Sequence, residues 1–331
     1  MTSGNVLHSP VFLDNLPDVT DIRNRHAAPY LLEREQQLLS LLRDPEVTWH
    51  DKECPACGPS GRPRHFLLGR LSFFRCQRCN TIYAARAPDQ AVLDGLRCEL
   101  VQPPGVTDDR LQEFTSILNW IRLSSARYER PLIELLDYRF DSHAPGFAEA
   151  VINLSNSERH WRHVPLLKDG GRDDAPFADL SRVLSTRPFQ AVLIQAEIDR
   201  SHSPRRLLQV LRDNLAPGSL VFVSTSCADG LEYEILGAES PSFVALDRLN
   251  LFSVQGFRML SEDVGFRCLE ISTPGRLDAA ILKSYFNEPT SNDMPFWSSF
   301  FREANRDRLQ DLQVLLQRSL RSGVMRVVLE V

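Results

Sequence analysis

The 331-residue sequence predicts an α/β fold in which a mainly parallel sheet is covered by helices on both faces and is preceded by a small zinc-binding ribbon. Two observations lead to this prediction. From residue 131 onward, near-continuous apolar runs alternate with helical stretches, as in parallel sheets that are buried on both faces. Nearer the N-terminus, two Cys-x-x-Cys pairs have the spacing of a structural zinc site.

The N-terminal 49 residues are expected to form an arm and a helix. Residues 1–28 contain two prolines and little periodicity, which favours an irregular arm. Tyr30–Arg43 is amphipathic, and its leucines cluster on one side. That leucine-rich side would pack on its own domain or contact another chain, and the sequence does not choose between the two.

Residues 50–87 are expected to form the zinc ribbon. In each Cys-x-x-Cys turn two thiolates converge, and two such turns complete a tetrahedral shell that leaves no position for water or substrate. Gly58 and Asn80, directly after the two pairs, suit a turn that needs positive φ. Two disulfides, or four unrelated buried cysteines, are the alternatives. The predicted ligands of this structural zinc ion are Cys54, Cys57, Cys76 and Cys79.

Composition is that of an ordinary globular protein, with 43% hydrophobic residues, 24% charged residues and a net charge of −5. No run approaches 18 apolar residues, so no membrane-spanning helix is expected. The first ten residues lack the pattern of a secretory signal, and the three other cysteines are scattered, which fits free thiols in a reducing compartment. We therefore expect a cytoplasmic protein.

The ribbon is locally basic. Residues 61–86 hold six arginines and no acidic residue, with aromatic residues interleaved. Such a surface could bind nucleic acid or another phosphate-bearing ligand. The interpretation that we favour is a small aromatic core with a solvated or docking face of arginines, because the rest of the chain shows no basic stripe. Nucleic acid is therefore not an expected partner.

The second half of the chain supplies the sheet. Strands are expected at Pro131–Tyr138, Ala150–Leu154, His163–Leu167, Phe189–Gln195, Ser219–Thr225, Phe266–Thr273 and Val324–Val331. Helices are expected at Arg110–Tyr128, Pro204–Leu215, Val254–Val264 and Leu309–Leu320. The last strand follows a helix, so it could enter the sheet antiparallel. We expect one main domain at 88–290, completed by a C-terminal helix and strand at 291–331.

Several ordered motifs carry a resemblance to a known family. They are the Cys54–Gly58 knuckle with its partner pair, Phe189–Val192, Ser203-Pro204, Leu215–Gly218, Arg248–Ser253, Val264–Phe266 and Ser272–Asp278. Over about residues 52–331 the chain resembles class I S-adenosylmethionine-dependent methyltransferases that carry an N-terminal zinc ribbon. The resemblance implies a Rossmann-like sheet of seven strands, the last of them an inserted antiparallel strand.

The resemblance fails where that family binds S-adenosylmethionine. The family has a glycine-rich turn after the first strand, whereas here Asp141 and His143 fall on glycine positions and Gly146 is the only glycine between 105 and 170. The second strand of the family ends in an acid that binds the ribose, and here Asn153 stands near that position. The candidate cofactor-binding residues are Asp141, His143, Gly146 and Asn153.

The catalytic positions implied by the resemblance also differ. The Glu-His pair of the family falls on Asp199 and Arg200, and a family histidine falls on Arg248. Arginine stays protonated at any working pH and cannot act as a base. We expect a methyltransferase-like zinc protein with lost or weakened S-adenosylmethionine binding, acting as a binding or partner subunit. Arg200 and Arg248 could then bind a small anion, or they could form surface ion pairs.

The alternative is an active methyltransferase with a sugar or small metabolite as acceptor. In that case Asp199, or a histidine of the cluster His160-Trp161-Arg162-His163, would supply the base. An ordinary helical turn is the other interpretation of this cluster.

Overall fold

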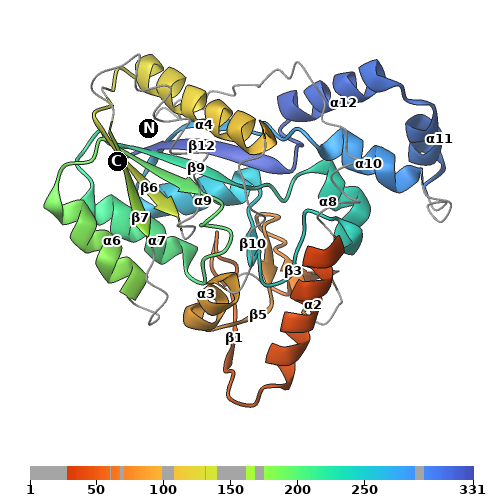
Figure 1. Ribbon diagram of the computed structural model, residues 1–331, viewed down its shortest axis with the longest axis horizontal. Coiled ribbons are helices and arrows are strands. Elements are labelled where there is room, and N and C mark those ends of the chain that lie inside the picture. Colours follow the sequence, from red (N-terminus) through yellow and green to blue (C-terminus); the bar gives the residue numbers. More distant parts are fainter. Residues whose placement is uncertain are drawn as a thin grey trace. The chain divides into compact units, whose positions relative to one another are not determined.

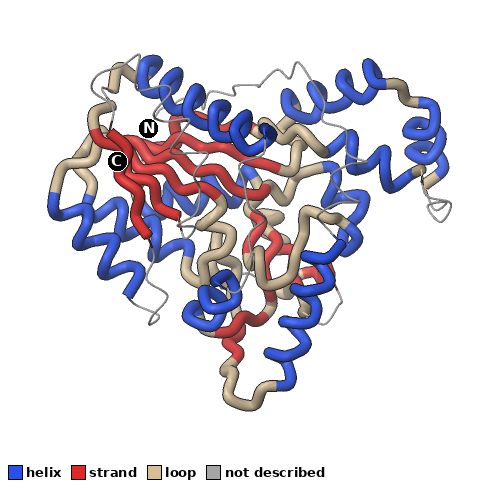
Figure 2. The backbone as a smooth tube through the Cα atoms, viewed as in Figure 1, coloured by secondary structure: helices blue, strands red, loops and turns tan. Residues whose placement is uncertain are grey.

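The structure is a computed structural model that describes residues 28–59, 61–67, 71–98, 108–130, 132–139, 162–167, 175–287 and 294–331. Figures 1 and 2 show its helices and strands. Its contacts divide the chain into two compact units. The ribbon unit comprises Met1–Pro88, Thr225–Leu260 and Glu270–Arg326, and the sheet unit comprises Asp89–Ser224, Ser261–Leu269 and Val327–Val331. The ribbon unit therefore contains much more than the cysteine-bearing segment.

Short antiparallel strands surround the four cysteines. β1 (Trp49–Asp51) pairs with β5 (Arg86–Pro88). A second small sheet has the order β10-β4-β3-β2. Three of its strands come from the predicted ribbon, namely β2 (Arg64–Leu67), β3 (Phe73–Arg75) and β4 (Ile82–Ala84). The fourth, β10 (Asn250–Leu251), comes from a distant part of the chain and pairs antiparallel with β4.

The ribbon also shares an aromatic core with the segment before β10. The Phe243 ring lies 4.6 Å from Phe73 and 6.2 Å from Phe66, centroid to centroid, in edge-to-face geometry. Helix α2 (Ala28–Arg43) joins the same body through Arg34, whose buried guanidinium lies 3.7 Å from Asp247. The ribbon is therefore packed into its unit rather than appended to it.

The main sheet has six strands in the order β11-β12-β9-β8-β6-β7 within the described residues. Its members are β6 (Glu134–Arg139), β7 (Arg162–Leu167), β8 (Ala191–Gln195), β9 (Leu220–Ser226), β11 (Arg267–Ser272) and β12 (Val324–Glu330). β7, β6, β8 and β9 are mutually parallel. The apolar runs of β6, β8 and β9 are buried, as the sequence pattern predicted.

The last strand enters this sheet antiparallel. At one end of β12 the Cys227 N–H donates to Gly323 O, at 2.9 Å. At the other end the Gly218 N–H donates to Val331 O, and the Val331 N–H donates to Ser219 O, each at 3.1 Å. The start of β12 thus lies beside the end of β9, which confirms the predicted direction. The chain has an α/β fold with a mixed sheet and a small N-terminal four-cysteine cluster among antiparallel strands.

Helices cover both faces of the sheet unit (Figure 1). The helix α4 (Asp108–Arg127) places Ile117, Leu118, Trp120 and Ile121 on one face, against side chains such as Leu193 and Phe222. The Trp120 and Phe222 rings meet edge-to-face at 5.2 Å. On the other side, α6 (Ala175–Thr186) and α7 (Pro204–Asn214) pack together, and the Ser181 Oγ donates to Asn214 Oδ1 at 2.9 Å. A further described helix of this unit is α3 (Gln90–Cys98).

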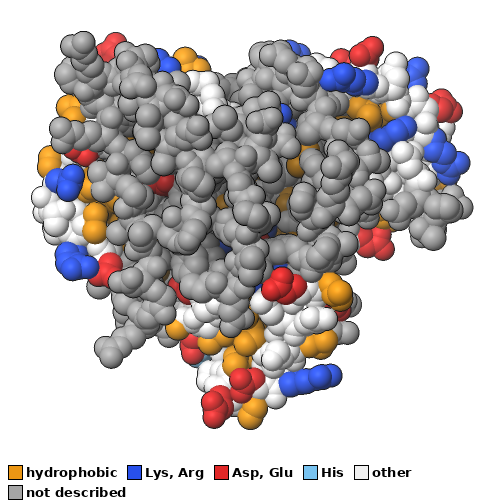
Figure 3. Space-filling model, viewed as in Figure 1, with side chains coloured by type: hydrophobic (Ala, Val, Ile, Leu, Met, Phe, Trp, Pro, Cys, Tyr) orange, Lys and Arg blue, Asp and Glu red, His pale blue; other side chains and the backbone are white. Residues whose placement is uncertain are grey.

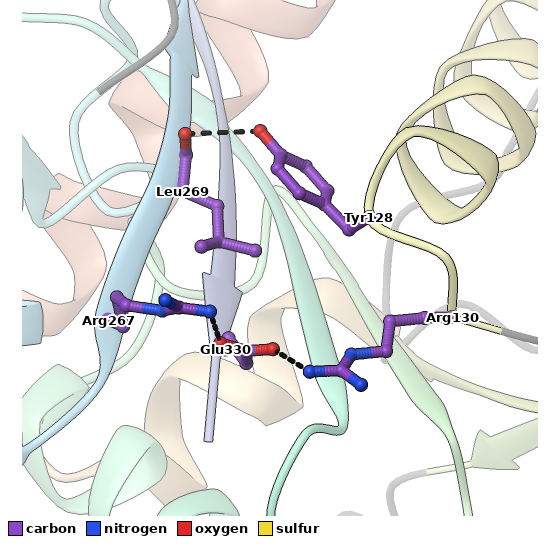
Figure 4. Close-up of polar contacts among 5 residues, drawn as sticks. All are labelled: Tyr128, Arg130, Arg267, Leu269 and Glu330. Atoms are coloured by element: carbon purple, nitrogen blue, oxygen red, sulfur yellow. Dashed lines mark hydrogen bonds and ion pairs between the residues drawn. The ribbon is translucent and has the colours of Figure 1, made fainter. Parts of the chain in front are cut away.

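A buried carboxylate ties α4 to the edge of the sheet (Figure 4). Glu330, at the end of β12, accepts hydrogen bonds from Arg130 at 2.5 Å and from Arg267 of β11. The Tyr128 hydroxyl donates to Leu269 O at 3.2 Å. Tyr128 and Arg130 follow the end of α4, so the helix end is held against the edge strand β11 and its neighbour β12.

The ribbon unit has its own helical core. Its helices are α8 (Leu231–Leu236), α10 (Asp278–Phe286), α11 (Pro295–Glu303) and α12 (Arg306–Arg318), with a 3₁₀ turn at Gly237–Glu239. α9 (Val254–Val264) begins in this unit and ends in the sheet unit. α10, α11 and α12 share an apolar cluster in which Phe286 and Phe301 are stacked at 5.3 Å.

Most predicted elements are confirmed within one to three residues, and α9 has the predicted bounds. The expected strand at Ala150–Leu154 lies outside the described residues. Arg162 and His163 lie in β7, so the helical-turn interpretation of these two residues is wrong, while His160 and Trp161 lie outside the described residues. Helices α3, α6, α8, α10 and α11 and the strand β10 were not predicted.

Candidate functional site

The four cysteines form one cluster. Their Sγ atoms all lie within 4.8 Å of one another. The Sγ–Sγ distance is 3.6 Å for Cys54 and Cys79, and 3.5 Å for Cys57 and Cys76. A tetrahedral zinc ion with Zn–S bonds of about 2.3 Å needs sulfurs about 3.8 Å apart, whereas a disulfide needs about 2.05 Å. The donor set and its spacing fit structural zinc, and the disulfide interpretation is wrong.

Both knuckles have the same local geometry. The Gly58 N–H donates to Cys54 O and the Asn80 N–H donates to Cys76 O, each at 2.9 Å. Gly58 has φ 71° and Asn80 has φ 61°, which confirms the positive φ expected after each pair. Each turn therefore brings its two thiols to one side, as a shared metal ion requires.

The thiols are crowded and largely buried. Cys54, Cys76 and Cys79 are buried, and Cys57 is partly exposed. Burial, followed by the hydrogen bond with Cys76, raises the pKa of the Cys57 thiol to about 12. The hydrogen bond from Cys54 lowers the pKa of Cys79 to about 5 against the opposing effect of burial. Four such sulfurs become thiolates together only with a cation among them, and a closed four-sulfur shell supports structure rather than catalysis.

Helix α9 begins directly on this cluster. The Ser253 Oγ donates to Cys79 O and accepts from the Gly256 N–H at 2.8 Å. A Cβ added to Gly256 would lie 3.3 Å from Ala56 Cβ in the first knuckle and closer still to Thr81 Oγ1 beside the second. The Asp229 Oδ2 accepts from the Val254 N–H at 2.8 Å. The first turn of α9 therefore contacts both knuckles.

The sheet unit offers a second candidate site at the carboxyl ends of its strands. The chain continues from β6 to its neighbour β7 and then returns to β8 on the other side of β6. In open α/β sheets, ligands bind in the crevice outside such a switch in strand order. Asp199 and Arg200 lie in the turn after β8, at this edge. Asp199 is fully buried and Arg200 is half-buried.

Of the remaining predicted site residues, the structure describes Arg248 alone. Arg248 is half-buried and lies in the ribbon unit, between Asp247, which pairs with Arg34, and Leu249, whose carbonyl accepts from the Ala84 N–H at 2.8 Å. Asp141, His143, Gly146 and Asn153 all lie outside the described residues.

Sequence reasoning missed Glu197. This carboxylate is buried with Asp199 in the loop after β8, and Ala196 before it has φ 54°. Positive φ at a residue other than glycine is uncommon and marks a constrained turn. The available signal was an acidic residue directly after an apolar strand, at an edge where the carboxyl ends of parallel strands meet.

Comparisons with known proteins give structural similarity alone. No protein-family model matches the chain, and no curated protein matches it. A solved plantazolicin methyltransferase, BamL, is 12% identical, with a TM-score of 0.40 over 67% of this chain and 86% of its own. A SAM-dependent methyltransferase from Archaeoglobus fulgidus is 10% identical, with a TM-score of 0.37 over 66% and 94%. A chain from the Haloferax volcanii complex of the Trm112 methyltransferase activator is 12% identical, with a TM-score of 0.38 over 72% and 96%.

Surface character is mixed. On the described part of the face in Figure 3, acidic and basic side chains are interspersed. Among the described helices, none combines the length and apolarity that crossing a membrane requires.

Proposed function

We propose that this chain is a methyltransferase-like zinc-binding protein with lost or weakened S-adenosylmethionine binding that acts as a binding or partner subunit. One observation carries the proposal: Asp199 and Arg200 occupy the turn after β8, at the switch in strand order. The resemblance puts a Glu-His pair there. Arginine cannot accept a proton, and Asp199 is fully buried.

We also propose that the domain boundaries lie at residues 88 and 291. A further part of the proposal is that Arg200 and Arg248 bind a small anion. A guanidinium at the carboxyl edge of the sheet would attract phosphate or carboxylate groups. Arg200 is half-buried there. The zinc ion would hold the knuckles in place and take no part in the binding of a ligand.

A second candidate, an active methyltransferase, is favoured by the position of β7. Among the described residues, Arg162–Leu167 is a strand that pairs in parallel with β6. In Rossmann-like sheets the ribose-binding acid follows the strand next to the first one. In the sequence, Asp169 stands two residues after the end of β7. Asp169 would then be the ribose-binding acid, which the sequence alignment had placed near Asn153 and therefore counted as lost.

Calorimetric titration of zinc-replete full-length protein with S-adenosylmethionine and S-adenosylhomocysteine separates the two candidates. The proposal expects no saturable heat at millimolar ligand. Micromolar binding that Asp169→Asn weakens at least tenfold would establish the active candidate instead. Glu239→Gln, an exposed substitution in the ribbon unit, is the matched control and should change neither result.

A further inference from the structure

Two arginines face each other on the ribbon hairpin. Arg64 of β2 lies directly opposite Arg75 of β3 in an antiparallel register. Opposed side chains in such a pair project to the same face, with Cβ atoms about 5 Å apart. Like charges in this arrangement destabilise a sheet. Arg64 is exposed and Arg75 is half-buried, so the repulsion is only partly screened by water.

Neither guanidinium has a hydrogen-bonded or ion-paired acceptor within the described part of the chain. The Arg75 guanidinium instead stacks over the Phe66 ring, 5.0 Å from its centroid. The Arg75 guanidinium is therefore positioned by the Phe66 ring and stabilises no other described part of the fold through a hydrogen bond or ion pair.

The two acidic residues near Arg75 are already engaged. Asp229 accepts the N–H of Val254 at the start of α9, 2.8 Å away. Glu234 lies 3.7 Å from the Arg321 guanidinium. Among the described contacts, neither carboxylate forms a hydrogen bond or ion pair with Arg75. Arg321 is thereby held by Glu234, within electrostatic range of Arg75.

We propose that Arg64 and Arg75 bind the phosphate group of a small ligand. Each guanidinium presents a planar fork of donors that matches phosphate oxygens. A phosphate dianion between the two forks balances both charges and turns their repulsion into attraction. A carboxylate would satisfy the pair less well, because it has one negative charge and two oxygens to share between two guanidinium groups. This binding would not depend on S-adenosylmethionine.

A small ligand fits better than nucleic acid. Glu234 and Asp229 stand beside the arginines and would repel the neighbouring phosphates of a polyanion. The chain as a whole carries a net charge of −5. A phosphate monoester or a diphosphate, unlike nucleic acid, would place its negative charge only at the Arg64–Arg75 pair.

The test is calorimetric titration of zinc-replete full-length protein with inorganic phosphate and with pyrophosphate at about 0.15 M salt. We expect Arg64→Ala and Arg75→Ala each to weaken binding at least tenfold. Arg75→Lys keeps the charge but loses the fork, so it should weaken binding severalfold. Arg86→Ala is the matched control, because Arg86 lies on the same ribbon but pairs with Asp51 at 3.1 Å. It should leave binding unchanged.

Thermal unfolding supplies a second readout that does not depend on heat signals. Without phosphate, Arg64→Ala should leave Tm unchanged or raise it, because the substitution removes a like-charge contact. With phosphate, only the wild type and Arg86→Ala should gain Tm. The proposal is overturned if neither probe binds at 10 mM, roughly the weakest binding that such a titration resolves. It is also overturned if Arg64→Ala and Arg86→Ala lose the same binding affinity, or if Arg64→Ala has a lower Tm than the wild type without phosphate. Salt-sensitive binding of an RNA oligomer without phosphate binding would also overturn it and assign the surface to nucleic acid.

Discussion

Gly256 is the residue at which α9 and the cysteine knuckles come closest. A Cβ at this position would lie 2.9 Å from Ser253 Oγ and 3.3 Å from Ala56 Cβ. Both neighbours are fixed, since Ser253 is hydrogen-bonded to Cys79 O and Ala56 is fully buried. The absence of a side chain is therefore what lets the first turn of α9 reach the metal site.

We expect Gly256→Ala to destabilise the protein by about 1–3 kcal/mol, the usual cost of overpacking a closed contact. Gly95→Ala is the control, because Gly95 lies in α3 and an added Cβ there meets nothing within 4 Å. That substitution should stabilise by about 0.5–1 kcal/mol. Urea unfolding of both zinc-replete variants measures the difference. Equal stabilities would show that α9 does not need the close approach.

Glu232 is a buried acid in a network of polar side chains. The Ser240 Oγ donates to Glu232 Oε1 at 2.5 Å. Asp278 nearby accepts from Ser322 Oγ at 2.5 Å, from the Gly323 N–H at 2.6 Å and from Gln313 Nε2 at 2.9 Å. Burial, with a further contribution from the charge of Asp278, raises the pKa of Glu232 to about 7.

This raised pKa predicts a pH-dependent stability. Between the ordinary glutamate pKa of 4.5 and about 7, the folded protein binds more protons than the unfolded chain. The contribution of neutral Glu232 is therefore complete below the lower pKa and is lost as pH rises towards 7, at no more than about 1.4 kcal/mol per pH unit. Glu232→Gln should flatten the free energy of unfolding between pH 5 and about 7. Unchanged pH dependence in urea titrations would refute the raised pKa.

At the scale of elements, the zinc ribbon and the segment 249–256 form one structure. β10 pairs with β4, and Ser253 and Gly256 contact the knuckles. Zinc binding supplies folding free energy on the order of 10 kcal/mol in such sites. Metal loss should therefore loosen β10 and the start of α9 as well as the ribbon itself.

Hydrogen exchange of zinc-replete and chelator-treated protein tests this coupling. We expect faster exchange of the Leu249–Gly256 amides after zinc removal, whereas β8 amides in the sheet unit should exchange as before. Cys79→Ser should reproduce the effect and lower the zinc content. Unchanged protection of Leu249–Gly256 in the metal-free protein would contradict it, as would stoichiometric zinc in a Cys76→Ser/Cys79→Ser double variant.

The end of α4 is held by a charge cluster rather than by packing alone. Burial by itself would raise the pKa of Glu330, but the hydrogen bonds from Arg130 and Arg267 outweigh it and the pKa lies below its ordinary value. The stability that this carboxylate contributes is present above pH 4.5 and is lost as pH falls through the lowered pKa.

Glu330→Gln should lower the free energy of unfolding at pH 7 by about 1–3 kcal/mol, since two hydrogen bonds from charged donors weaken. The loss should shrink below pH 4, where the wild-type carboxylate is itself protonated. Urea unfolding at pH 7 and pH 3.5 measures both values. Glu239→Gln, at an exposed position, should show no change. A loss that is equal at the two pH values would point to packing rather than charge.

At the scale of the whole molecule, the strand order predicts that a ligand would bind at the carboxyl ends of β6 and β8. If the cofactor site is lost, S-adenosylhomocysteine should leave Tm unchanged. A bound ligand at 100 times its Kd would add about 2.7 kcal/mol to the free energy of unfolding. Thermal unfolding with and without 1 mM ligand (about 100 times a Kd of order 10 μM) therefore checks the calorimetric result by a second observable.

Local patterns in the sequence determined the elements whose signals are contiguous. The two Cys-x-x-Cys pairs with Gly58 and Asn80, the helix Val254–Val264 and the β-branched last strand are all of this kind. Each is encoded by spacing or periodicity within about a dozen residues, so no knowledge of distant neighbours was needed to predict it.

Tertiary structure alone decided the features that depend on partners far away in the chain. β10 has two residues and no periodicity, and it is a strand only because β4 offers it hydrogen bonds. The sequence pattern did not show that β7 would lie beside β6, and only the hydrogen-bonded pairing of the two strands shows it. Glu232 has a raised pKa because the fold buries it near the charge of Asp278. Arg64 lies opposite Arg75 because of the register in which β2 and β3 pair. Burial, register and electrostatic environment arise from packing between segments, and a local pattern does not contain them.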